Sequence, residues 1–388
     1  MNRVRFRHPT APFFVDLSII QSSPTKNRRP LPKYTLREAG VFQNQETYEV
    51  ELELDNQRIS KSQYTTETLM ILLRQHIRLV LAGIQQTQYP IGYQEMEKIT
   101  NEYMDMIHGQ GRNRTLPIRN RDFLGPSSYT LQLNHIMATS DDDRNVRKNY
   151  CVTDKADGSR MLLYVSKDSK LYMIDTNMRI MYMGCVLANR DTKVKFQQSL
   201  LDGEFIQGNK QGKSIQLFAA FDMYYHHNQC VSHHYFMRPT VLSDETKGGT
   251  YRLELLQNFV TTLNENITHT NMVQPCTYRI QCKRFESHES IFTACRNVLA
   301  RVYEYTTDGL IFTPMNAAVG ADPGNKTHTP IVSKISWEYS FKWKPPEYNT
   351  VDFLVKAKRH PVTGEEEIAY QSDVDGVDVN DASHGIQP

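Results

Sequence analysis

Residues 150–165, YCVTDKADGSRMLLYV, carry the pattern that decides the fold of this chain. Two apolar runs flank a polar insert, which predicts strand, tight turn and strand, with Gly158 relieving the backbone at the turn. The insert holds one lysine, Lys155, in a setting that suits a nucleophile. Asp157 can orient its amine, and the positive charge of Arg160 favours the neutral form. A neutral amine can attack an electrophile and form a covalent intermediate.

The pattern K-x-D-G is a weak signal by itself, and an ordinary polar hairpin fits it equally well.

The length and composition of the chain limit the classes of protein to which it can belong. The 388 residues leave room for two or three domains, and a net charge of +2 means that any basic surface must be local. The chain has no run of about 20 apolar residues and no apolar signal peptide, so we expect no membrane partner. Six scattered cysteines without a C-x-x-C pair predict reduced thiols in a cytoplasmic protein.

Residues 1–58 predict β structure, and residues 48–54 form its most regular strand. Glu49, Glu51 and Glu53 alternate with apolar residues, so the three glutamates share one face. Three carboxylates in a row repel one another unless they are solvated or bound to a cation. Two interpretations stay open. One is a solvent-facing strand, and the other is a metal site inside a barrel whose neighbouring arginines hold polyphosphate.

Apolar residues at helical spacing over residues 60–108 predict packing helices, the second at 93–107. After residue 123 the pattern is α+β, with strands dominating. We expect strands at 170–175, 180–184, 200–206, 214–225, 307–313, 339–343 and 349–356, and helices at 251–263 and 291–304.

A group of zinc-competent side chains follows the 214–225 strand. It contains His226, His227, Cys230, His233 and His234. Because the spacing matches no standard zinc motif, we favour a solvated hairpin over a metal site.

A lysine that attacks the α-phosphate of a nucleotide needs cations on the phosphate, carboxylates for a divalent metal and an apolar surface for the base. The chain supplies each of these in order on strand-like segments. They are Glu204 and Asp308 for the metal, Lys342 and Lys344 for the phosphate, Arg160 for ribose or phosphate, and Phe221 or Phe218 for the base.

In this order the segments resemble the covalent nucleotidyltransferase superfamily, which contains mRNA capping guanylyltransferases and ATP-dependent DNA and RNA ligases. The resemblance covers about residues 120–356. Residues 155–160 resemble motif I, 171–184 motif III, 202–204 with 218–222 the DGE and IIIa elements, 308–312 motif IV, and 340–353 motif V. The form of motif V, with K-W-K-P-P and N-T-V-D-F, is similar to capping guanylyltransferases, most of all those of large DNA viruses.

The resemblance implies an α+β, ATP-grasp-like nucleotidyltransferase fold of antiparallel sheets with helices. It implies that Lys155 takes GMP from GTP as a covalent lysyl-GMP and passes it to the 5′-diphosphate end of RNA. Mg²⁺ or Mn²⁺ is the implied cofactor, and a methyltransferase domain or subunit is a further implied partner. If the protein is viral, the host cytoplasm or the virion is its expected location. The implied nucleotide-binding residues are Arg160, Glu204, Phe221, Asp308, Lys342, Lys344 and Asp352.

Three segments are expected. Residues 1–108 resemble part of a tunnel-type, metal-dependent RNA triphosphatase, with the three strand glutamates as metal ligands. No glutamate precedes Glu38, so the family's earlier E-x-E strand is not found. Residues 109–355 form the guanylyltransferase domain, and residues 356–388 begin a truncated OB-fold domain or form a disordered tail. Two alternatives stay open: an ATP-dependent polynucleotide ligase of the same fold, and a catalytically incomplete capping-enzyme scaffold.

Overall fold

The computed structural model describes most of the chain in two compact units, Met1–Trp343 and Lys344–Pro388. The division into three segments stays a prediction. The predicted strand at 349–356, with Asp352, lies outside the described residues. The described residues are 1–9, 11–26, 29–62, 64–109, 117–138, 144–187, 197–238, 249–269, 278–323, 335–348, 357–359 and 366–368.

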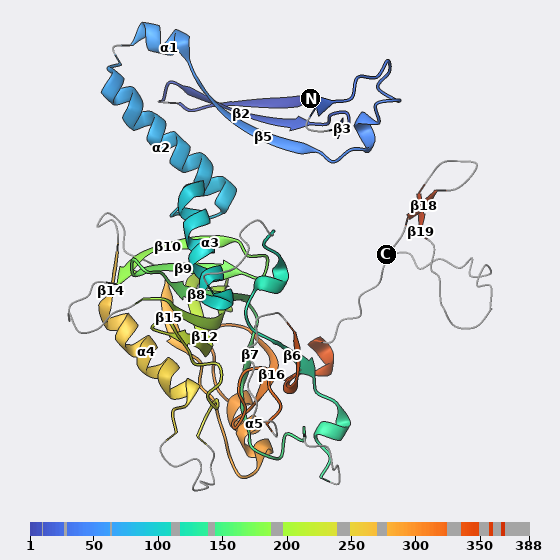
Figure 1. The fold of residues 1–388 in the computed structure, drawn as a ribbon, viewed down its shortest axis with the longest axis vertical. Coiled ribbons are helices and arrows are strands. Elements are labelled where there is room, and N and C mark those ends of the chain that lie inside the picture. The colour runs from blue at the N-terminus through green and yellow to red at the C-terminus, as the bar shows by residue number, and fades with distance from the viewer. Residues whose placement is uncertain are drawn as a thin grey trace. The chain divides into compact units, whose positions relative to one another are not determined.

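The chain begins with an antiparallel sheet in the order β1-β2-β5, drawn in blue in Figure 1. Its strands are β1 (Asn2–Arg7), β2 (Phe13–Ile20) and β5 (Thr47–Leu54). In the register of the sheet, Arg5 lies beside Asp16, which lies beside Glu51. Alternation therefore gives the sheet one charged face, as the sequence predicted for the glutamate strand. Short elements follow β2: β3 (Thr25–Lys26), β4 (Arg29–Pro30) and η1 (Val41–Gln43).

The predicted helical region is confirmed as α1 (Asn56–Lys61), α2 (Thr66–Gln85) and α3 (Tyr93–His108). Thr65 caps α2 by accepting a hydrogen bond from the Thr68 N–H, and α2 ends at Gln86 in a left-handed conformation. The apolar side of α3 is buried in one core with the strands of the larger sheet.

The larger sheet follows the order β13-β12-β11-β8-β9-β10-β14, and β15 pairs with β12. Leu163 and Val165 of β8 share a core with helix α4 (Arg252–Asn266), whereas Leu162 and Tyr164 share the α3 core. Successive side chains of β8 point to opposite faces of the sheet, so this strand packs against α4 on one face and against α3 on the other. The strands are β8 (Ser159–Val165), β9 (Lys170–Asp175), β10 (Ile180–Leu187), β11 (Ser199–Gly208), β12 (Ser214–His226), β13 (Gln229–Cys230), β14 (Ile267–His269) and β15 (Arg279–Cys282).

A smaller sheet has the order β6-β17-β16-β7 and packs against α5 (Ile291–Leu299). Its strands are β6 (Ser127–Thr130), β7 (Tyr150–Ala156), β16 (Thr307–Pro314) and β17 (Ser336–Trp343). Helix α5 ends at Leu299, so the predicted helix at 291–304 was too long. The residues that follow α5 instead run beside the end of β7, where the Thr306 carbonyl accepts a hydrogen bond from the Asp157 N–H.

The turn that contains Lys155 connects the two sheets. Strand β7 pairs with β16 in the smaller sheet, whereas β8 pairs with β9 and β11 in the larger one. Strand, turn and strand were predicted correctly, but the alternative of a polar hairpin is wrong. Gly158 is required by close approach, because a Cβ there would lie 2.7 Å from the Phe205 carbonyl oxygen and 2.9 Å from Glu204 Cγ.

The remaining described elements are short. They are η2 (Asn120–Asp122), η3 (Leu133–His135) and, in the second unit, η5 (Pro346–Tyr348) and the antiparallel pair β18 (Ala357–Arg359) and β19 (Glu366–Ile368). Within the described part of the chain, no helix is long and apolar enough to span a membrane. The cysteines of that part are free, as the sequence predicted.

Candidate active site

A pocket of ≈190 Å³ lies between the two sheets and brings together residues that are far apart in the sequence. The smaller sheet contributes Lys155, and the larger sheet contributes Arg160, Glu204 and Phe221. Four predicted site residues therefore line one pocket. Its volume is below the roughly 300–1,000 Å³ of typical ligand pockets, which suits part of a nucleotide. Phe218, the alternative base-stacking residue, is fully buried in the α4 core.

Lys155 lies near the end of β7, and its Nζ donates to both carboxylate oxygens of Asp308, at 2.7 and 3.0 Å. Asp308 comes from β16 and is buried. The carboxylate that orients the lysine is therefore Asp308, and the expectation for Asp157 was wrong. Asp157 is exposed at the turn. The strand pairing of β7 with β16 explains the difference, because it places these distant residues side by side.

Glu204 of β11 faces the pocket beside Arg160, its neighbour in the register of the sheet. Burial raises the pKa of the Glu204 carboxyl to about 7, although the charges of Lys283 and Lys155 act in the opposite direction. Desolvation wins because the charged form loses its water shell. The charge of Glu204 therefore changes near neutral pH.

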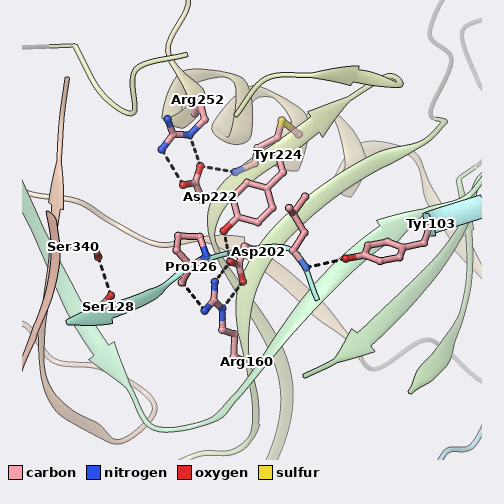
Figure 2. A network of polar contacts seen from close by, with 11 residues as sticks. Tyr103, Pro126, Ser128, Arg160, Asp202, Asp222, Tyr224, Arg252 and Ser340 are labelled. Atoms are coloured by element: carbon pink, nitrogen blue, oxygen red, sulfur yellow. Dashed lines mark hydrogen bonds and ion pairs between the residues drawn. The ribbon is translucent and has the colours of Figure 1, made fainter. Parts of the chain in front are cut away.

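A buried polar network holds Arg160 in place (Figure 2). Its Nε donates to Asp202 Oδ1 at 3.1 Å, its Nη2 donates to Asp202 Oδ2, and its Nη1 donates to the Pro126 carbonyl oxygen at 2.8 Å. The Tyr224 hydroxyl also donates to Asp202. Asp202 is fully buried and forms an ion pair with Arg160. Arg160 still lines the pocket, 5.8 Å from the centre of the Phe221 ring.

The loop before β6 fits against this network without space for a side chain. Gly125 has φ 122°, and a Cβ there would lie 2.6 Å from Arg160 Nη2 and 2.7 Å from the Tyr224 hydroxyl. Tyr103 of α3 anchors the same loop, because its hydroxyl accepts from the Leu124 N–H at 2.9 Å. The role of Gly125 was missed. The only signal in the sequence is a glycine before a proline.

Lys283 was also missed as a site residue. It is 7% exposed, lines the pocket, and its Nζ pairs with Asp154 Oδ2 at 3.0 Å. Tyr305 donates its hydroxyl to the same carboxylate oxygen at 3.1 Å. Lys283 follows β15, whose parallel pairing with β12 carries the lysine into the pocket. No local motif surrounds it, so only the fold reveals a buried ammonium group there.

Comparison with known proteins agrees with this geometry. Residues 137–328, which include Lys155, Glu204 and Asp308, match the family model of the mRNA capping enzyme, catalytic domain. The chain contains an mRNA capping enzyme catalytic domain. It is 24% identical over 361 residues to a probable mRNA-capping enzyme of Acanthamoeba polyphaga mimivirus, covering 84% of this chain and 27% of that protein.

The capping domain also has a cellular relative. The chain is 26% identical over 247 residues to mRNA-capping enzyme subunit alpha of Schizosaccharomyces pombe, covering 60% of this chain and 53% of that subunit. The chain thus spans about a quarter and about half of the lengths of these two relatives.

Among solved structures, the ligase domain of LigD from M. tuberculosis matches with 10% identity and a TM-score of 0.34, covering 59% of this chain and 61% of that one. A mycobacterial DNA ligase D complexed with ATP and MES matches with 11% identity and a TM-score of 0.32, covering 59% and 62%.

The other two predicted phosphate ligands, Lys342 and Lys344, are not among the residues that line the pocket. Lys342 is exposed on β17 and pairs with Ile311, which lines the pocket. Alternation puts Lys342 on the same side of β17 as the pocket residue Ser340. Lys344 belongs to the second compact unit.

The N-terminal sheet brings together three acids, within 4.8 Å of one another: Asp16, Glu51 and Glu53. The predicted set was therefore incomplete, because it omitted Asp16 of β2, and Glu49 is not in this group. Arg5 donates to Asp16 at 2.7 and 2.6 Å and to Glu53 at 2.5 Å. The hydrogen bond from Arg5 lowers the pKa of the Asp16 carboxyl. Arginine and acid thus face each other across the strands.

The histidine-rich segment is a hairpin of β12 and β13, as favoured from the sequence. The imidazoles of His226 and His227 lie 4.1 Å apart between ring centres. Burial lowers the pKa of His226 to about 4, so this side chain is neutral near pH 7. Among the described residues of this hairpin, no three metal-ligating side chains lie close enough together to hold one ion.

Proposed function

We propose that the capping domain transfers GMP from GTP to the 5′-diphosphate end of RNA through Lys155. The amine attacks the α-phosphorus of GTP, a P–N bond forms, and the bond to the β-phosphate oxygen breaks, so pyrophosphate leaves. A terminal β-phosphate oxygen of the RNA then attacks the same phosphorus, and the P–N bond breaks. The observation that carries the proposal is Lys155 held by Asp308 in a pocket with an aromatic surface.

The pocket also supports GTP over ATP. Phe221 offers its ring to a purine base, and Lys283 supplies a buried ammonium group, which only donates hydrogen bonds. Guanine presents the O6 acceptor where adenine presents an amino donor. We therefore assign the choice of base to Lys283.

Glu204 and Asp308 fit a divalent cation, because carboxylate oxygens are the ligands that Mg²⁺ and Mn²⁺ prefer and the substrate phosphates complete the set. When bound, the ion neutralises the charge of the leaving pyrophosphate. If Asp308 held the ion, it would no longer pair with Lys155, and the amine would be released for attack. We assign Lys342 and Lys344 to the phosphates and leave Asp352 as a predicted nucleotide contact.

Labelling with α-³²P-GTP tests the proposal. Wild-type protein with Mg²⁺ or Mn²⁺ should give an acid-labile, base-stable band on a denaturing gel, and Lys155→Ala should give none. Lys148→Ala, an exposed lysine before the other end of β7, is the matched control and should keep the band. Labelling with ATP instead would indicate a ligase. Labelling with neither nucleotide would indicate a catalytically incomplete scaffold.

A second proposal concerns the N-terminal sheet. We infer that β1, β2 and β5 are part of a metal-dependent RNA triphosphatase tunnel, because Asp16, Glu51 and Glu53 converge beside arginines that suit phosphate. Release of the γ-phosphate from 5′-triphosphate RNA with Mn²⁺ should then be lost in Glu51→Gln. Release that persists in this variant would reject the assignment.

A further inference from the structure

Residues 303–306 run directly beside the turn that carries the nucleophile. The Thr306 carbonyl accepts a hydrogen bond from the Asp157 N–H at 2.9 Å. The Tyr305 hydroxyl donates to Asp154, the residue before Lys155, at 3.1 Å. The segment therefore lies next to the residues on both sides of Lys155 in the chain.

The segment carries two aromatic rings, each packed against an apolar cluster. Tyr303 and Tyr305 are half-buried, and their ring centres lie 5.5 Å apart at 43°. The Tyr303 hydroxyl donates to the Val298 carbonyl oxygen at 3.2 Å, which ties the ring to the end of α5. Partly exposed, anchored rings are the surfaces on which unpaired bases stack.

Lysines lie on the adjoining hairpin, residues 209–213 between β11 and β12. The Lys210 N–H donates to the Glu304 carbonyl oxygen at 3.2 Å, so the hairpin is attached to the tyrosine segment. Lys210 and Lys213 are exposed, and no ion pair of either lysine is found among the described residues. The chain as a whole has a net charge of only +2, so these lysines form a local basic site.

The packing beneath holds hairpin and segment together. Ile206 and Ile215, which flank the hairpin, share one apolar cluster with Ala156 and Tyr305. The acids near the segment include Asp154, Glu304 and Asp157, and Asp154 is buried and paired with Lys283. Arg279 neutralises Glu304 through contacts of 2.7 and 3.0 Å, which leaves Asp157 as the exposed acid. The lysines are therefore not cancelled by their surroundings.

We propose that Lys210, Lys213, Tyr303 and Tyr305 form an RNA surface. It binds the single-stranded nucleotides that follow the 5′-diphosphate end, with the lysines on phosphates and the tyrosines on bases. The proposal rests on the proposed function, because that function brings the RNA end to Lys155. Aromatic and basic side chains side by side favour single-stranded RNA over a protein partner.

The variant Lys210→Glu/Lys213→Glu tests the lysines. Formation of lysyl-GMP and transfer to a 5′-diphosphate dinucleotide should stay at the wild-type level, whereas the KM for a long 5′-diphosphate RNA should rise roughly tenfold. The plot of log affinity against log salt concentration should become less steep by about 1.4, since each of the two lost single-strand phosphate contacts contributes about 0.7 to the slope. The matched control is Lys148→Glu/Lys167→Glu, which makes the same charge change away from the surface. An equal rise of KM in the control would overturn the proposal.

Substitution of Tyr303 tests stacking. Tyr303→Leu should weaken binding of single-stranded RNA about tenfold, because a base loses the ring on which it stacks. Tyr303→Phe keeps the ring and should bind like wild type. Fluorescence anisotropy with labelled 5′-diphosphate RNA measures this without turnover. Weaker binding in the variants would therefore support the RNA surface, whether or not the wild-type protein forms lysyl-GMP. A wild-type protein that forms no lysyl-GMP would reject the proposed function but not the RNA surface. Unchanged binding in all variants, or loss of a protein partner instead of RNA, would overturn the surface.

Discussion

At the scale of single residues, Glu204 decides how the site responds to pH. Its carboxyl lies near Lys155 and Lys283 in the pocket, and burial raises its pKa to about 7 from the ordinary 4.5. If Glu204 holds the cation in its charged form, lysyl-GMP formation should increase as pH rises through about 7. Gel labelling across this range checks the dependence.

The same group links pH to stability. Because the folded-state pKa of Glu204 lies above the unfolded value, its favourable contribution is complete below about pH 4.5 and is lost as pH rises through about 7. Above about pH 7 the folded wild type must hold a charged carboxylate in the pocket, and Glu204→Gln replaces it with a neutral amide. The substitution should therefore raise the free energy of unfolding by up to about 3 kcal/mol near pH 8. Near pH 4 wild type and variant should be equal. Denaturant unfolding at both pH values measures this, and a lower stability of the variant near pH 8 would contradict it.

At the scale of elements, the loop of residues 123–126 joins α3 to the pocket. It is held by Tyr103 on one side and by Arg160 on the other (Figure 2). The loop thus helps to set the position of Arg160, which is predicted to bind the nucleotide.

Gly125→Ala should disturb this arrangement. The new Cβ would lie within 2.9 Å of side-chain atoms of Arg160, Asp202 and Tyr224, and alanine tolerates the φ of 122° poorly. We expect a loss of roughly 1–3 kcal/mol of stability and at least a tenfold rise in the KM for GTP. Gly83→Ala in α2 is the control, because no atom lies within 4 Å of its Cβ and alanine favours helix. Equal effects of the two substitutions on KM would argue against the role of the loop.

At the scale of the whole molecule, the pocket depends on two sheets that share no strand. The smaller sheet holds Lys155 and the larger sheet holds Arg160, Glu204 and Phe221. A nucleotide that binds there contacts both.

GTP should therefore protect both sheets from hydrogen exchange at once. In Lys155→Ala, which binds without reacting, we expect slower exchange in β7 and β16 together with β8 and β11. GTP at about 100 times its Kd should stabilise the folded state by about 2.7 kcal/mol. The N-terminal sheet serves as the internal control. Protection of a single sheet would show that the nucleotide does not bind between them.

Local patterns predicted much of the chain. The alternation of Glu49, Glu51 and Glu53 predicted their strand, and the spacing of apolar residues predicted α2 and α3. Both patterns are local, because side chains on one face of a strand or helix recur at a short fixed spacing in the sequence. The K-x-D-G turn predicted Lys155 as the nucleophile, and its order with Glu204 and Asp308 predicted the chemistry. These features depend on side-chain type and short spacing alone.

Other features were decided by the tertiary structure. Strands β7 and β8 are neighbours in sequence yet belong to different sheets, and the carboxylate at Lys155 comes from Asp308, 153 positions away. Asp16 and Lys283 joined their sites in the same way. Strands pair with segments that are distant in the sequence, and packing of the whole core determines which segments pair. No local sequence pattern identifies the partner strand. The sequence by itself determined the candidate reacting groups, and only the fold determined which of them meet.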